Sequence, residues 1–362
     1  MTVSLDEFRR EIRLEADGSR RVVLTTAALI VLLIFVALLS LTHGAVAVPS
    51  GRVAEILVHA LEARESDSTQ DTLVVTDIRL PRLFLGMMVG GALGMSGALM
   101  QGLFRNPLAD PGLAGVSAGA GLGAALAIVL GDRASLGFVR LSSFSLLPAA
   151  AFLGALAATS ILYAVATRGG RTSVATMLLA GVALAALASS FIGVLAYVSD
   201  DRQLRDLTFW SMGSLGGANW AKVAALAPIA ALMLASGLFL SRGLNALALG
   251  EAEAFHLGVR LQGLKTAIVF LVAIAVGASV AAAGVISFVG IVAPHALRLV
   301  IGPNHRPLLP LSVAAGAALL SGADVLSRTL VAPAEMPIGV LTAAIGAPFF
   351  LWLLTRSGGS LG

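Results

Sequence analysis

Histidines are the residues of this chain best suited to bind a metal ion or transfer protons, and there are five of them: His43, His59, His256, His295 and His305. None stands at a metal-binding spacing such as H-x-x-x-H. The chain contains no cysteine, which excludes disulfides, thiolate catalysis and zinc–thiolate sites. These residue types therefore predict no catalytic centre and no metal site.

One glycine-containing sequence approaches a phosphate-binding motif, GVRLQGLKT from Gly258 to Thr266. A P-loop requires G-x-x-x-x-G-K-[ST], whereas here Leu264 separates Gly263 from Lys265. No strand pattern precedes the sequence either. We therefore expect that this chain does not bind ATP through a Walker A motif and is not an enzyme.

Ionisable residues inside apolar segments are functional candidates by default, and here they are few. Asp324 stands four residues before Arg328 and could pair with it on one helix face, and Glu335 precedes the last apolar segment. Chains of acidic or histidine residues in the middle of the apolar segments are missing. This argues against an ion-coupled secondary transporter, the alternative from a different class, and against an intramembrane enzyme.

The composition indicates that these residues are carried by a polytopic membrane protein. Hydrophobic residues make up 57% and charged residues 12% of the chain, whereas soluble domains are about 25% charged. The mean hydropathy is +0.93 and the sequence pI is 10.3. The net charge is only +4, and no basic block with interleaved aromatic residues occurs, so nucleic-acid binding is not expected.

Ten apolar segments are long enough, or nearly so, for the about 20 residues of a membrane span. They are 22–41, 83–103, 112–130, 146–166, 174–198, 221–240, 266–284, 286–301, 308–326 and 338–354. The segment 286–301 is short and contains Pro294 and His295, which predicts a broken or partly buried helix. Residues 1–21 form a mixed-charge amphipathic segment, and residues 22–356 one transmembrane domain.

The stretch 79–120 organises the chain. Gly86, Gly90, Gly94 and Gly97 fall on one face of a predicted helix, and such small residues let membrane helices approach closely. The sequence then breaks at Asn106, Pro107 and Pro111, which we interpret as a structural knee, before a second glycine- and alanine-rich run begins. We expect two membrane helices joined at this polar knee.

Three connecting segments carry patterns of their own. Residues 53–61 show helical spacing, which predicts a short surface helix within 43–78. The loop 199–220 contains three aromatic residues and is either part of an interfacial aromatic belt or the mouth of a pore. The loop 241–266 is too polar to span a membrane and predicts two short helices, with Gly250 and Gly258 as their ends, that dock a soluble partner.

The distribution of the 24 Lys and Arg residues indicates an orientation. With the N-terminus inside and the spans alternating, the inner segments hold more of these residues than the outer segments, in accordance with the positive-inside rule. We therefore expect both termini and the 241–265 loop in the cytoplasm.

Several sequence blocks together resemble one family. They are RLPR (79–82), GMSGALMQGLFRNPLADPGLAGVSAGA (94–120), LLAGVALA (178–185), LGEAEAFHLGV (249–259), GVISFVGIVAPHALRLVIGPNHRPLLP (284–310), ADVLSR (323–328) and EMPIGVLTAAIGAPFFLWLL (335–354). From about residue 75 to the C-terminus, the chain resembles the FecCD family, the permease subunits of type II ABC importers for haem, ferric siderophores and cobalamin.

The resemblance implies a fold with ten transmembrane helices, a homodimer in the bacterial inner membrane, two cytoplasmic ATPase subunits that bind ATP and magnesium, and a periplasmic binding protein. It implies that Arg79, Arg82 and Arg328 dock the binding protein; their alternative role is that of lipid-interface anchors. It also implies that the inner loop couples to the ATPase through Leu249, Gly250, Glu251, Ala254, Phe255, Leu257, Gly258 and Arg260.

Within this family, the run LTFWSMGSLGGANW (207–220) is most similar to the haem-importing branch. The expected substrate is therefore haem, with ferric siderophores and cobalamin as alternatives. The residues expected to line the translocation path or its periplasmic mouth are Phe191, Phe209, Trp210, Met212 and Gly213. No cofactor is expected to bind to this chain itself.

Overall fold

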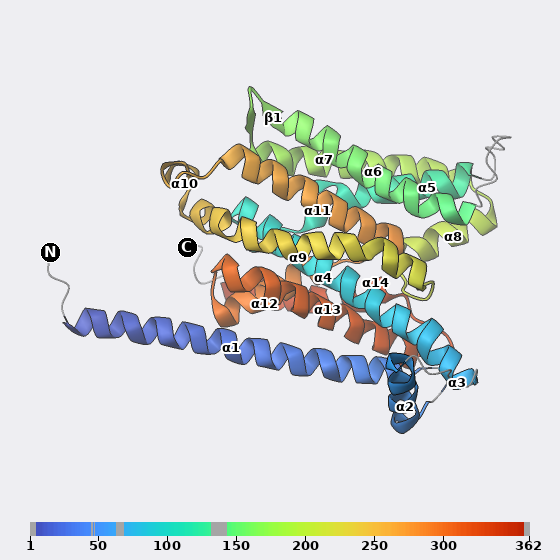
Figure 1. Ribbon diagram of the computed structural model, residues 1–362. Helices are drawn as coiled ribbons and strands as arrows, with labels where there is room; N and C mark the ends of the chain where they lie inside the picture. The colour runs from blue at the N-terminus through green and yellow to red at the C-terminus, as the bar shows by residue number, and fades with distance from the viewer. Residues whose placement is uncertain (1–4, 45, 47, 63–68, 132–142, 358–362) are drawn as a thin grey trace.

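Long helices, roughly aligned in one bundle, make up most of the chain (Figure 1). The computed structural model describes residues 5–44, 46, 48–62, 69–131 and 143–357. The helices are α1 (Leu5–Thr42), α2 (Ser50–Leu61), α3 (Gln70–Leu73), the π-helical turn η1 (Val74–Arg79), α4 (Leu80–Phe104), the 3₁₀ turn η2 (Pro111–Ala114), α5 (Val116–Leu130), α6 (Ser143–Ala166), α7 (Val174–Tyr197), α8 (Asp201–Ser211), α9 (Trp220–Leu249), α10 (Glu251–His256), α11 (Leu261–Ala283), α12 (Val289–Ile301), α13 (His305–Thr329) and α14 (Ile338–Ser357). Between α6 and α7, the antiparallel strands β1 (Thr167–Arg168) and β2 (Arg171–Thr172) form a hairpin.

The expected all-α polytopic fold is confirmed, with a qualification on the number of spans. Seven helices in the described ranges are long and apolar enough to cross a membrane, and three more apolar helices are shorter. Together they account for the ten predicted segments, but the length criterion alone supports seven spans. The short α12 corresponds to the predicted segment 286–301 and is partly buried, but it runs unbroken through Pro294. The backbone instead turns before α12 begins, at Gly284 and Phe288, which both have positive φ.

Two predicted segments start differently in the structure. The helix α1 is continuous from Leu5 to Thr42, so the expected segment 1–21 and the first span belong to one helix; residues 1–4 lie outside the described chain. The second span begins earlier than residue 83, since α3, η1 and α4 form one helical stretch, Gln70–Phe104. Pro81 has no N–H for the preceding turn, and the helix widens into η1 directly before it.

The helix α4 is the centre of the molecule. Nearly all of its residues are buried, and it packs against α9, α11, α12 and, most extensively, α13. A Cβ atom on Gly90 would overlap the carbonyl oxygen of Gly316 in α13, and one on Gly97 would overlap that of Gly290 in α12. The predicted role of the glycine face is therefore confirmed: small residues allow backbone contact between these helices.

The bundle has two distinct ends (Figure 1). The helix α10, the β-hairpin, the start of α1 and the end of α14 lie toward one end, whereas α2, α3 and α8 lie toward the other. The predicted surface helix is α2, whose Val53 and Ile56 are buried against residues at the end of α1 and in η1. We refer to these as the α10 end and the α8 end.

Candidate functional site

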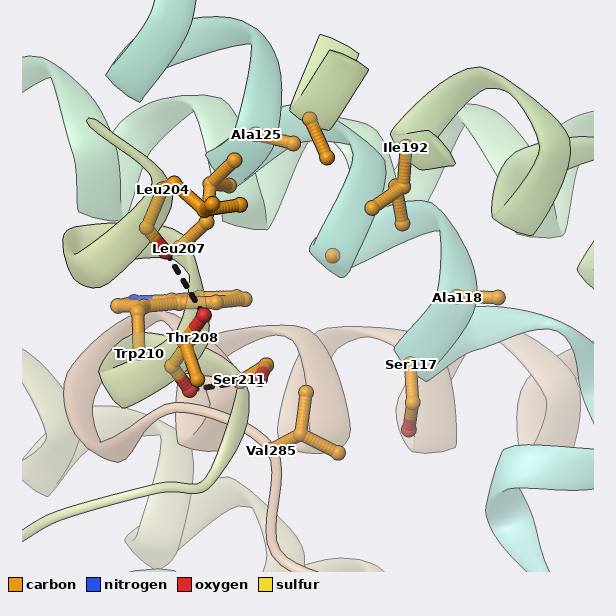
Figure 2. A pocket seen from close by; sticks show the side chains of 12 residues that line it. Ser117, Ala118, Ala125, Ile192, Leu204, Leu207, Thr208, Trp210, Ser211 and Val285 are labelled. Carbon is orange, nitrogen blue, oxygen red and sulfur yellow. Dashed lines mark hydrogen bonds between the residues drawn. The ribbon is translucent and has the colours of Figure 1, made fainter. Parts of the chain in front are cut away.

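A cavity of about 360 Å³ lies beside α8 and is the first candidate for the site (Figure 2). Its size falls within the about 300–1,000 Å³ typical of small-molecule pockets. In Figure 2 the side chain of Trp210 lies on one side of it, Ser117 and Ala118 of α5 lie on the other, and Val285 lies below. The lining therefore combines α5, α7 and α8 with the segment that follows α11.

The cavity presents mainly apolar surface. The hydroxyl of Thr208 donates a hydrogen bond to the carbonyl of Leu204 at 2.7 Å, and that of Ser211 donates to the carbonyl of Thr208 at 2.8 Å. Both donors are thus used within α8, and the remaining lining is mostly Ala, Leu, Ile and Trp. Such a surface can contact an apolar solute without holding it through many hydrogen bonds.

Ser117 of this cavity lies in the sequence Gly115–Gly119, which has the spacing G-x-S-x-G. In a nucleophile elbow this spacing lies between a strand and a helix, whereas here a 3₁₀ turn precedes α5. Among the described residues that line the cavity, no histidine, Asp or Glu could serve as a base. The serine is therefore part of the lining and not a nucleophile.

Of the residues expected at the mouth, only Trp210 lines this cavity. Phe209 is exposed, and Met212 and Gly213 belong to the turn that ends α8, where Gly213 has a φ of +71°. Phe191 lines a different cavity, of about 260 Å³, between α5, α6 and α7. These five residues therefore do not line one common cavity, because α7 directs Ile192 toward α8 and Phe191 elsewhere.

The sequence did not single out Leu204, Leu207 and Thr208, although they share the Trp210 cavity. The loop 199–220 was interpreted through its aromatic residues. Its capping box, with Asp200 accepting from the backbone N–H of Gln203 and the Gln203 side chain accepting in return, could have identified α8.

The knee after α4 determines where α5 begins, beside the cavity. The helix α4 ends as Arg105 adopts φ +49°, and the Asn106 side chain accepts a hydrogen bond from the Leu108 N–H at 2.9 Å. The 3₁₀ turn then starts at Pro111, which would be contacted by a Cβ on Gly290 of α12. Pro107 lies between these two turns.

A network of buried charges lies at the α8 end and involves the predicted docking arginines. Arg82 of α4 contacts Asp324 of α13 through Nε at 2.9 and 3.1 Å, and forms two hydrogen bonds to Glu335 at 2.8 and 2.9 Å. Arg328 pairs with Asp324 at 3.2 Å, which confirms the pair expected from their i, i+4 spacing. Asp324 is 2% exposed and the Glu335 side chain 44% exposed.

The arginines of this network also form hydrogen bonds to the end of α1. Arg328 donates to the hydroxyl and the carbonyl of Ser40 at 3.0 and 3.2 Å. Arg79 donates to the carbonyls of Leu41 and Val46. Glu335 lies in the connection between α13 and α14, where the hydrogen bond from Arg82 lowers the pKa of its carboxyl group. Four parts of the chain are thereby joined.

The location of Arg79, Arg82 and Arg328 differs from the expectation of surface groups. They are 3%, 5% and 6% exposed, so in this structure they face neither a docked protein nor lipid. The reason is the pairing with Asp324, Glu335 and backbone carbonyls, which satisfies the guanidinium groups inside the subunit. Contact of a partner with these groups requires the network to open.

The α10 end carries an exposed apolar surface. Leu249, Phe255 and Leu257 are 68%, 69% and 64% exposed, and Gly258 and Arg260 are exposed beside them. Gly250, with a φ of +136°, separates α9 from α10. The prediction of a separate short helix at the start of this loop is wrong, because residues 241–249 belong to the last turns of α9. We call Leu249, Phe255 and Leu257 the α10 surface.

Two of the expected coupling residues lie inward. Ala254 is 0% exposed and Gly250 is buried, so both lie in the packing of α10 against the bundle. Glu251 pairs with the buried Lys265 of α11 at 2.8 Å, and Lys265 also donates to the carbonyl of Thr172 in the β-hairpin at 3.0 Å. The α10 surface is thus rigidly connected to α11 and to the hairpin.

Comparisons with known proteins give consistent matches. The FecCD transport family matches residues 32–356. The chain is 47% identical over 299 residues to the hemin transport system permease protein HmuU of Yersinia pestis, covering 80% of this chain and 86% of that protein. It is 41% identical over 315 residues to the cobalamin import system permease protein BtuC of Halobacterium salinarum, covering 86% and 82%.

A further relative is the vitamin B12 import system permease protein BtuC of Klebsiella pneumoniae, 44% identical over 295 residues. A solved structure of a metal-chelate type ABC transporter in an inward-facing conformation matches with a TM-score of 0.78 at 32% identity, covering 91% of this chain and 98% of that chain. The chain is thus a multi-pass permease of a type II ABC importer and not an enzyme. It belongs to the FecCD transport family.

Proposed function

We propose that this permease imports haem. The observation that carries the proposal is the 47% identity to the hemin permease of Yersinia pestis across 86% of that protein, compared with 41% and 44% for the cobalamin and vitamin B12 permeases. The apolar cavity beside Trp210 supports it, since haem is a flat and largely apolar molecule. The weakly polar lining suits a pathway from which the solute must also leave.

Cobalamin is the second candidate substrate. The cobalamin permease of Halobacterium salinarum matches over 315 residues, a longer stretch than the hemin permease does. Iron–siderophore complexes form the third candidate, consistent with the metal-chelate transporter structure. These three substrates differ in size and charge, so direct transport assays separate them.

The partners follow from the two ends of the bundle. We place the α10 end and both termini in the cytoplasm of a bacterial inner membrane, with an ATPase subunit on the α10 surface and ATP and magnesium bound there and not to this chain. A periplasmic binding protein would approach the α8 end. A second copy of the chain would complete a symmetric pathway, and two ATPase subunits would drive it.

In the proposed mechanism, the α10 end receives the movement of the ATPase and the Trp210 cavity responds to it. Closure of the ATPase pair moves α10, and the ion pair of Glu251 with Lys265 carries this movement into α11 and the β-hairpin. Since α11 leads to Val285, which lines the cavity, the movement reaches the Trp210 cavity. Packed helices then shift as rigid bodies between inward- and outward-facing states.

The test is uptake into vesicles that contain the permease and its ATPase, with ATP inside. Separate samples receive a haem-, cobalamin- or ferric-siderophore-loaded binding protein. Haem uptake that requires the ATPase is the expected result. Uptake of cobalamin or siderophore without haem uptake would show that haem is not the substrate. Uptake without the ATPase would refute the proposal of an ATP-driven importer.

Docking of the binding protein through Arg79, Arg82 and Arg328 is tested by charge reversal. Each Arg→Glu change should weaken docking and reduce its salt dependence. Glu335→Gln serves as the matched variant, because it frees part of Arg82 without removing the cation, and it should strengthen docking. Docking that is unchanged in all four variants would show that these arginines only join helices inside the subunit.

A further inference from the structure

A second cavity, of about 410 Å³, lies at the α10 end between α9 and α13, outside the site described above. Its apolar lining includes Leu234, Leu238, Phe239 and Pro310. Leu238 and Phe239 are 77% and 80% exposed, which are high values for large apolar side chains. In a membrane protein, such a surface faces lipid chains or another apolar partner.

Two arginines line the same cavity. Arg242 lies on α9 and Arg306 in the first turn of α13, and both side chains are exposed. Within the described part of the chain, neither guanidinium group forms an ion pair or a hydrogen bond, and no acidic residue lines the cavity. This contrasts with Arg82 and Arg328 at the α8 end, whose charges are matched by carboxylates.

The backbone beneath the two arginines is held in place. The Asn245 side chain donates to Asn304 at 2.9 Å and accepts from the backbone N–H of His305 at 2.8 Å, so α9 is joined to the start of α13. The N-terminus of α13 adds partial positive charge near Arg306. The two cations thus extend from a connected pair of helices and not from a loop.

The position of the cavity along α9 corresponds to a membrane interface. Along α9, Trp220 and Arg242 are separated by about 33 Å at about 1.5 Å per residue, close to the about 30 Å of the hydrocarbon core. Trp220 and Arg242 are thus placed near opposite membrane interfaces. Leu238 and Phe239, one turn before Arg242, then lie within the hydrocarbon.

We propose that Arg242 and Arg306 bind the headgroup phosphate of an anionic phospholipid, whose acyl chains lie against Leu238 and Phe239. Charge complementarity favours a phosphate, and the apolar surface directly beside it favours a molecule that carries hydrocarbon chains. Basic pockets between transmembrane helices bind anionic headgroups for this reason. The lipid would bridge α9 and α13 at the end of the molecule that includes α10.

The test measures lipid binding to the purified full-length permease by native mass spectrometry and by the shift in Tm. The probes are dioleoyl-phosphatidylglycerol and dioleoyl-phosphatidylcholine, which share acyl chains and differ in headgroup charge. Phosphatidylglycerol should bind and raise Tm, and phosphatidylcholine should not. The double variant Arg242→Gln/Arg306→Gln should weaken phosphatidylglycerol binding about 30-fold.

Three controls sharpen the result. Arg168→Gln/Arg171→Gln removes two exposed arginines of the β-hairpin, at the same end but outside this cavity, and should leave binding unchanged. Arg242→Lys/Arg306→Lys keeps the charges and should retain most of the binding. Leu238→Ala/Phe239→Ala should weaken binding while the arginines remain.

Equal loss of binding in the cavity and hairpin variants would overturn the proposal, since any surface cation would then serve. Equal binding of phosphatidylcholine, or displacement of phosphatidylglycerol by inorganic phosphate, would overturn it as well. A double variant that loses association with the ATPase or with a second copy, but binds phosphatidylglycerol normally, would identify a protein interface instead.

Discussion

Replacing Asp324 by asparagine should be among the most destabilising single changes at the α8 end. The side chain is 2% exposed and neutralises both Arg82, at 2.9 Å, and Arg328, at 3.2 Å. Asparagine has nearly the same shape but no charge, and its amide group would direct donors toward guanidinium donors. Removing one partner of a buried ion pair costs about 3–5 kcal/mol, because it leaves an uncompensated buried charge.

We expect the lower part of that range, about 3 kcal/mol, since Arg82 keeps Glu335 and Arg328 keeps Ser40. At about 2–4 °C per kcal/mol for a chain of this size, Tm should fall by about 6–12 °C. Glu335→Gln is the matched control. It removes a carboxylate from the same arginine, but its side chain is 44% exposed, so the expected loss is at most about 1 kcal/mol.

Thermal unfolding in one detergent, with one protein concentration for all variants, measures both changes. Adding Arg328→Gln to Asp324→Asn should recover part of the lost Tm, because it removes one of the two unmatched cations. Equal Tm losses for Asp324→Asn and Glu335→Gln would refute the argument that burial decides the strength of these pairs. A further decrease in the double variant would refute the charge-balance argument.

Three more predictions concern packing, coupling and pH. Gly97→Ala should lower Tm, because overpacking against the Gly290 backbone costs about 1–3 kcal/mol. The control Gly193→Ala should leave Tm unchanged, since no described atom lies near its new Cβ. Equal effects of the two variants on Tm would contradict the close packing of Gly97. Phe255→Ala should keep Tm but reduce ATPase binding in a pull-down, since this side chain is 69% exposed; normal binding would exclude it from the interface. Arg82 lowers the pKa of the Glu335 carboxyl group in the folded protein. The stabilisation by the Glu335 carboxylate is therefore complete above the unfolded-state pKa of about 4.3 and is lost as the pH falls through the lower pKa of the folded state. The Tm difference between wild type and Glu335→Gln should thus be constant from neutral pH to about pH 5 and vanish in stronger acid.

Periodic features of the sequence were predictable, because they depend on the geometry of one helix. The spacing of Gly90, Gly94 and Gly97 predicted the face on which α4 meets α13 and α12. The four-residue spacing of Asp324 and Arg328 predicted their pair. Each of these conclusions needs only the rise and turn of an α-helix.

Features that join distant segments were not predictable. Arg82 lies 242 residues before Asp324 and 253 residues before Glu335, and no local pattern indicates that their side chains meet. The burial of Ala254 depends on how α10 folds back after Gly250. Phe191 and Ile192 are adjacent in sequence, yet they line different cavities because α7 turns them toward different neighbours.

The sequence pI of 10.3 does not mean that the molecule has one continuous basic surface. At the α8 end, Arg82 and Arg328 are satisfied by carboxylates and by backbone oxygens within the subunit, so in this structure they join helices and reach a partner only when the network opens. At the α10 end, Arg242 and Arg306 have no carboxylate beside them among the described side chains, and they lie next to apolar side chains that face outward. Arginine therefore has a different task at each end, and the difference is decided by whether the chain supplies the anion itself. Where it does, the cation stabilises the fold; where it does not, the membrane is the nearest source of a phosphate.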